Sequence, residues 1–115
     1  MKIKFSIIII VFFLFSFPVN LLAAQVLQVR SSSTLLIGDR NRTFTVKIAC
    51  IEVEQDQEEM AKYWLKDKVS GKKRVNLMPT GSQEGILLAK VISIDSKEDL
   101  GKGLVDEGFA RSECN

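Results

Sequence analysis

The sequence contains no histidine, one tryptophan, one tyrosine and only two cysteines among its 115 residues. Histidine is the general base of Ser-His-Asp and Cys-His hydrolases, so its absence excludes nucleophilic catalysis of those two kinds. It also removes the commonest protein ligand of transition metals. Two cysteines cannot form a zinc site by themselves, because such a site takes four ligands, usually at short spacings.

The longest apolar run lies at the start of the chain. Lys2 and Lys4 precede residues 5–17, which are Ile, Val, Phe and Leu apart from two serines, and Pro18 then ends the run. This length is typical of a signal-peptide core, whereas a membrane-spanning helix needs about 20 apolar residues. We predict a signal peptide over residues 1–24, cut after Ala24, although Leu22 stands where a small residue is usual.

This reading predicts an exported protein, secreted, periplasmic or lumenal, with one domain over residues 25–115. An uncleaved leader is the alternative, and it would anchor that domain to a membrane. Membrane contact is expected only through the leader.

Neither sign of charge is in clear excess. The whole chain has a formal net charge of +2, and removing Lys2 and Lys4 with the leader leaves equal numbers of basic and acidic residues. Proteins that bind phosphate backbones usually carry a basic excess, because contacts with phosphates supply most of their affinity. Nucleic acid is therefore not a partner that the charge favours, and the sequence identifies no other partner.

The two cysteines, Cys50 and Cys114, lie far apart in the chain. In an oxidising compartment an even pair indicates a disulfide, and the predicted export is its main support. The alternative is two free thiols, with Cys50 in the core and Cys114 in a loose tail. A domain of this size has a modest core, so a covalent link between them would matter for its stability.

The pattern after the leader predicts strands first. Residues 25–30 and 34–37 are rich in strand-forming side chains, and the polar stretch 38–42 has the chemistry of a hairpin turn. Residues 43–50 alternate, with Phe44, Val46, Ile48 and Cys50 on one face. The sequence therefore predicts an antiparallel hairpin formed by the second and third strands.

Helix and strand signals alternate in the second half. Acidic residues at 54–59 precede apolar residues at helical spacing up to Val69, and Gly71 can end this helix. Strands are expected over 74–78 and 86–94. Ser96 is expected to cap a short second helix that ends at Gly108 and that two internal glycines weaken. The predicted class is α+β, mostly β with two helices, built on a five-stranded, partly open barrel of the OB-fold type.

Three segments together resemble the thermonuclease (staphylococcal-nuclease-like) family. Residues 31–35 and 44–52 stand where that family has its Asp-Gly-Asp-Thr and Arg-Leu-Leu-Gly-Ile-Asp-Ala-Pro-Glu strands, and residues 86–91 stand where it has Arg, one residue, then Leu-Ala-Tyr-Val. Residues 100–110, Leu-Gly-Lys-Gly-Leu-Val-Asp-Glu-Gly-Phe-Ala, are close to the family's Leu-Asn-Glu-Ala-Leu-Val-Arg-Glu-Gly-Leu-Ala. The resemblance covers residues 26–110 and implies the barrel of the staphylococcal nuclease type.

The resemblance also implies positions for a metal site. The family holds Ca²⁺ with two Asp side chains and one backbone carbonyl, because a hard cation prefers oxygen ligands. Ser33, Glu52 and Val53 occupy these three positions here. Ser33 offers only a neutral hydroxyl, Glu52 keeps the carboxylate on a longer side chain, and Val53 offers its carbonyl.

The family's reacting groups are a glutamate base and two arginines that bind the phosphate. The base position falls near Gln55, which cannot take a proton at neutral pH. The arginine positions hold Lys47, which keeps the charge without the planar fork, and Ile86, which has neither. Together with Glu52, Lys47 and Gln55 are the catalytic positions that the resemblance assigns.

This pattern predicts a family member that has lost the ordinary reaction and acts as a binding or structural module. The alternative is a phosphodiesterase or nuclease with an altered site, for which Ca²⁺ would be the cofactor. A third reading, a barrel that binds oligonucleotides or oligosaccharides without cutting them, would need exposed aromatic side chains as stacking platforms. Tyr63 and Trp64 lie on the predicted helix and Phe44 on the predicted inner face, so this reading has little support.

Overall fold

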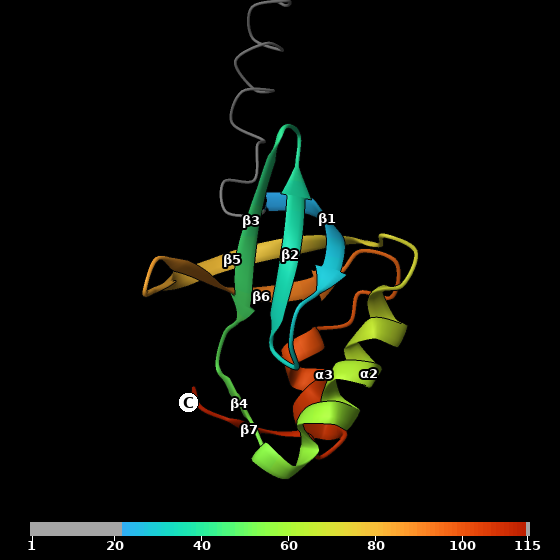
Figure 1. Cartoon of the computed structure of the whole chain (residues 1–115), viewed down its shortest axis with the longest axis vertical. Coiled ribbons are helices and arrows are strands. Elements are labelled where there is room, and N and C mark those ends of the chain that lie inside the picture. The colour runs from blue at the N-terminus through green and yellow to red at the C-terminus, as the bar shows by residue number, and fades with distance from the viewer. Residues whose placement is uncertain (1–21, 115) are drawn as a thin grey trace, which may run out of the picture.

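The computed structural model describes residues 22–114. Most of the predicted signal peptide lies outside these residues. Five strands form a closed barrel in the order β1-β2-β3-β6-β5 (Figure 1). Their bounds are β1 Leu22–Val29, β2 Thr34–Asp39, β3 Arg42–Ile48, β5 Arg74–Gln83 and β6 Ile86–Ser93. The predicted class, mostly β with two helices on an OB-fold-like five-stranded barrel, is confirmed, and the barrel is closed rather than partly open.

All the neighbouring strands of the barrel are antiparallel except β3 and β6, which run parallel. The predicted hairpin of the second and third strands is confirmed as β2–β3, with Leu35 opposite Val46 and Ile37 opposite Phe44. Parallel strands need a long connection, and here it runs through a helix, α2, before returning to the barrel.

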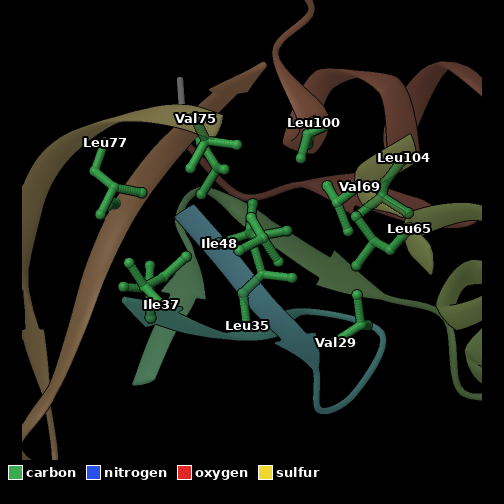
Figure 2. Packing of buried hydrophobic residues seen from close by; sticks show 14 of the residues in the cluster. Val29, Leu35, Ile37, Ile48, Leu65, Val69, Val75, Leu77, Leu100 and Leu104 are labelled. Atoms are coloured by element: carbon green, nitrogen blue, oxygen red, sulfur yellow. The ribbon is translucent and has the colours of Figure 1, made fainter. Parts of the chain in front are cut away.

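Alternating apolar side chains fill the barrel. On β2 and β3 the buried positions are Leu35, Ile37, Val46 and Ile48, all at most 1% exposed. The strands β5 and β6 contribute Val75, Leu77, Ala89 and Val91, all fully buried. Figure 2 shows several of these side chains meeting in one cluster with residues from the two helices. Because strand side chains alternate, the polar residues between them lie on the outer face.

Two α-helices, α2 (Glu58–Val69) and α3 (Leu100–Asp106), lie at the end of the barrel where β1 and β3 finish (Figure 1). The helix α2 buries Ala61, Leu65 and Val69, which recur at helical spacing, and a short 3₁₀ turn η1 (Gln55–Gln57) precedes it. The helix α3 buries Leu100 and Leu104 in the same core. Both helices therefore cover this end of the barrel.

The start of α3 differs from the prediction. Ser96 was expected to begin the helix, but Asp99 is its N-cap, and its Oδ1 accepts a hydrogen bond from the backbone N–H of Lys102 at 3.2 Å. An N-cap carboxylate satisfies a backbone donor that the first helical turn leaves free. Ser96 instead lies in the preceding turn, where its N–H donates to Ser93 Oγ at 3.4 Å.

The third strand ends earlier than predicted. It was expected to include Cys50 on its inner face, but β3 ends at Ile48, and Cys50 lies in a turn with a φ of +66°. This left-handed conformation breaks the strand and redirects the chain. A short strand follows, β4 (Ile51–Val53), which pairs with the C-terminal strand β7 (Ala110–Ser112) outside the barrel.

A disulfide joins Cys50 to Cys114, with their Cα atoms 4.8 Å apart. The predicted link is confirmed, and the alternative of two free thiols is wrong. The backbone N–H of Glu113 also donates to the carbonyl of Cys50 at 2.8 Å. The C-terminal segment is thereby fixed beside the turn that follows β3.

The first strand begins before the predicted domain boundary. Leu22, Ala23 and Ala24 belong to β1 and pair with Leu77, Asn76 and Val75 of β5. Ala24 is 4% exposed and belongs to the core. The barrel therefore uses residues that the predicted leader would carry. No helix within residues 22–114 is long and apolar enough to span a membrane.

The disulfide predicts a large effect of reduction on stability. It closes a loop across a sequence separation of 64 residues, which corresponds to about 4 kcal/mol in the chain-entropy model. We expect the free energy of unfolding in guanidinium chloride to fall by about that amount in the Cys50→Ser/Cys114→Ser variant. Equal unfolding midpoints for the variant and the oxidised protein would contradict a stabilising role.

Gly103 predicts an unusual response to alanine. Ala normally stabilises a helix by about 1 kcal/mol relative to Gly. A Cβ at this position would lie 2.5 Å from Cη2 of Trp64, which the neighbouring helix holds against it. We therefore expect Gly103→Ala to destabilise the fold by about 1–3 kcal/mol in chemical denaturation. Gly81→Ala is the control, because nothing lies within 4 Å of the added Cβ there.

Candidate functional site

Lys47 lies on the outer face of the barrel. Its neighbours on β3, Val46 and Ile48, point into the core, so the Lys47 side chain points outward. The register places Thr34 of β2 on one side of it and Leu88 of β6 on the other. On the outer face, Lys47 therefore lies between Thr34, which carries a hydroxyl, and the apolar Leu88.

Ser33 lies in the turn that leads into β2, beside the end of β3. Its carbonyl accepts a hydrogen bond from the N–H of Ile48 at 2.8 Å, and its own N–H donates to Ser31 Oγ at 3.3 Å. The hydroxyls of Ser31 and Thr34 are also hydrogen-bonded to each other. The structure thus brings Ser33 next to the strand that carries Lys47.

The buried hydroxyl in this turn belongs to Ser32, which the sequence did not single out. Ser32 is 2% exposed, and its Oγ donates to Oε1 of Glu58 at 2.8 Å. Glu58 is the first residue of α2. This bond links the turn before β2 to the start of the helix and positions both.

Glu52 and Val53 lie outside the barrel on β4. Glu52 is exposed and stands opposite Arg111 of β7, while Val53 is half-buried opposite Ala110 and packs against the core. Gln55 follows as the first residue of η1 and is exposed. Glu52 and Val53 therefore belong to a different sheet from Lys47, and Gln55 lies in the helical turn that follows.

Ile86 is the first residue of β6 and is half-buried. It lies two positions before Leu88, on the same face of the strand, and Leu88 is the register partner of Lys47. The position where the resemblance implies a second arginine therefore lies near Lys47, but it carries an isoleucine.

Arg111 is a residue that sequence reasoning missed. Its guanidinium group forms ion pairs with Glu54 at 3.3 Å and with Glu113 at 3.8 Å. Its position could have been inferred from the predicted disulfide, because a link from Cys50 to Cys114 brings the residues that precede Cys114 beside those that follow Cys50. Arg111 is 63% exposed, so these pairs contribute little to stability.

The positions that the resemblance assigns to calcium do not fit that ion. They provide one carboxylate, one hydroxyl and one backbone carbonyl, whereas Ca²⁺ takes six to eight oxygen ligands and favours several carboxylates. Within the described part of the chain, no group of three or more Asp, Glu or Cys side chains could hold a metal ion. We therefore derive no reaction step through calcium.

No protein-family model matches the chain, and no match was found among the curated proteins. The relation to thermonucleases therefore remains a prediction that depends on the sequence motifs.

The bond from Ser32 to Glu58 predicts a measurable loss of stability. Ser32→Ala removes the donor and leaves the Glu58 carboxylate without this partner, so we expect the free energy of unfolding to fall by about 1 kcal/mol. Urea denaturation measures this difference. Ser82→Ala, at an exposed position in β5, is the matched control and is expected to change it by less than about 0.5 kcal/mol. Equal effects of the two substitutions would contradict a linking role for Ser32.

Proposed function

We propose that this chain is an exported, thermonuclease-like domain that acts as a binding or structural module without phosphodiesterase activity. Export is supported by the apolar leader in the sequence and by the disulfide between Cys50 and Cys114, since disulfides persist in oxidising compartments. Family membership is supported by the three motifs and is compatible with the five-stranded barrel. Because OB-type barrels serve many functions, the argument against catalysis depends on the site itself.

The surroundings of Lys47 carry that argument. In-line attack on a phosphodiester builds negative charge on the phosphate oxygens, and donors placed around the phosphorus stabilise that charge. Lys47 is one such donor, but its register neighbours are Thr34 and Leu88, and Ile86 lies beyond Leu88 on the same face. The exposed Lys90, two positions after Leu88 on the same face of β6, adds a second amine, but neither amine has the planar fork of the arginines that the resemblance implies.

The position that the resemblance assigns to the general base also lacks a titratable group. A general base must accept a proton from the attacking water, and the side-chain amide of Gln55 cannot do so near neutral pH. Removing one preorganised donor costs an enzyme about 100- to 1,000-fold in rate, and losing the base adds a factor of about 100 to 10,000. The losses together leave little of the ordinary rate enhancement.

The test is a cleavage assay on protein exported by an expression host and purified without reductant. Single- and double-stranded DNA and RNA are incubated with Ca²⁺, with Mg²⁺ or with a chelator, and an active thermonuclease is assayed alongside. We expect no metal-dependent cleavage, and we expect the Glu52→Ala and Lys47→Ala variants to behave like the unmodified protein.

The alternative is a metal-dependent phosphodiesterase with an altered site, favoured by the retained charges of Lys47 and Glu52. Metal-dependent cleavage that Glu52→Ala abolishes, with an unchanged unfolding midpoint, would overturn our proposal and establish this alternative. Cleavage that survives both substitutions would point to a contaminating nuclease, and the unmodified protein would then be purified further and assayed again.

A further inference from the structure

A second polar surface lies at the opposite end of the barrel from Ser33. The β2–β3 hairpin turns at Arg40 and Asn41, far from the turn that precedes β2 (Figure 1). An open cleft of about 940 Å³ lies between this hairpin and the beginning of β1. Its lining includes Ala23, Ala24, Gly38, Arg40, Arg42 and Arg74. None of these residues belongs to the site around Lys47.

The cleft lies over a row of residues from three strands. Gln25 of β1 pairs with Gly38 on one side and with Arg74 on the other. Leu27 fills the space into which a Cβ at Gly38 would project, with its Cδ1 2.9 Å away, so the open part of the cleft lies beyond Leu27. The hairpin residue Arg40 and the strand residue Arg74 border this part of the cleft from different strands.

The charge of the lining is strongly positive. It contains Arg40, Arg42 and Arg74 against a single acid, Asp39. Arg42 pairs with Asp39 at 3.2 Å, and its guanidinium group lies 5.7 Å from the centre of the Phe44 ring. Within residues 22–114, Arg40 and Arg74 have no carboxylate within 4.0 Å. Two guanidinium groups therefore border the cleft without a counter-charge from this part of the chain.

Some lysines elsewhere on the described surface do have a carboxylate partner. Lys68 pairs with Glu98 at 3.2 Å, Lys73 with Asp95 at 3.1 Å and Lys102 with Asp106 at 3.4 Å. These ion pairs are consistent with the ordinary use of charge on a solvated surface. The arginines of the cleft line one hollow together with a single acid, so their positive potentials add there and favour the binding of an anion.

We propose that this cleft binds a phosphate-bearing anion through Arg40 and Arg74, with Arg42 at its side. A guanidinium group presents a planar fork of donors that matches phosphate oxygens better than an amine does. Strands are spaced about 4.8 Å apart, so Arg74 and Gly38 lie roughly 10 Å apart across β1. Arginines on the two sides of such a gap can converge on one phosphate.

Phosphate could come from a soluble ligand or from a lipid headgroup. The lining residues Ala23 and Ala24 follow shortly after the apolar run 5–17, so an uncleaved leader in a bilayer would keep the cleft near the headgroups. The chemistry is the same for both sources, and the experiment separates them. The inference does not depend on the proposed loss of catalysis, because the two sites share no residue.

The test uses the full chain purified in a non-ionic detergent. Binding of inorganic pyrophosphate is measured by titration calorimetry at low salt, and binding to vesicles with or without phosphatidylglycerol is measured by flotation. We expect the Arg40→Gln/Arg74→Gln variant to bind the phosphate probe at least about tenfold more weakly, because it loses charge-assisted hydrogen bonds. The Arg40→Lys/Arg74→Lys variant keeps the charge without the planar fork. Its affinity for the phosphate probe is expected to lie between those of the original protein and the glutamine variant.

The matched control is Lys90→Gln/Lys97→Gln, which removes the same charge from exposed positions outside the cleft. It is expected to bind within about twofold of the original protein. Binding only to phosphatidylglycerol vesicles would assign the site to a lipid headgroup, and binding only to pyrophosphate would assign it to a soluble ligand. No binding to either probe, or equal weakening in the lysine control, would overturn the proposal. Unchanged unfolding midpoints verify that each variant is folded.

Discussion

The apolar interior of the barrel is the constraint on which the other features of this protein depend. Leu35, Val46, Leu77 and Val91 come from four different strands and are completely buried. Burying a large aliphatic side chain is worth about 1.5–3 kcal/mol, so a one-residue shift of any strand would expose its buried set and cost several times that amount. The register is thereby fixed, and with it every outward position. Because Val46 and Val75 must point into the core and side chains alternate along a strand, the adjacent residues Lys47 and Arg74 point outward.

The end of the barrel covered by the helices needs additional links. There β3 stops at Ile48, Cys50 turns the chain in a left-handed conformation, and the short strand β4 finds its partner in β7. Strands of three residues are marginal on their own, so the disulfide to Cys114 and the contacts of β7 with α3 support this pairing. The bond between Ser32 and Glu58 ties the same end to α2. Glu52 and Gln55, two positions that the resemblance assigns, lie outside the barrel strands. Their location therefore depends on these links and not on the barrel alone.

The two ends of the barrel differ in how they use charge. At the end near Ser33, charged groups such as Arg111 and Glu54 pair with each other, and the face around Lys47 is partly apolar. At the hairpin end, Arg40 and Arg74 border an open cleft with one acid. A protein with little net charge can still present a local positive potential, because potential depends on where the charges lie. The overall charge balance therefore does not describe the local potential at each end of the barrel.

The sequence alone determined the class of fold, because its signals are local. The alternation of residues 43–48 and the spacing of Ala61, Leu65 and Val69 report which face of each element is buried. Met60, which belongs to the same helical pattern, is nevertheless 60% exposed. The Cys50–Cys114 link could be predicted from the presence of two cysteines behind a predicted export signal. Only the tertiary structure decided that β1 includes Leu22, that Asp99 rather than Ser96 caps α3, and that Arg111 stands opposite Glu52. It also gathered Arg40 and Arg74 around one cleft. Apart from the cap of α3, these outcomes depend on pairing between distant segments, and the chemistry of one segment carries little information about its partner.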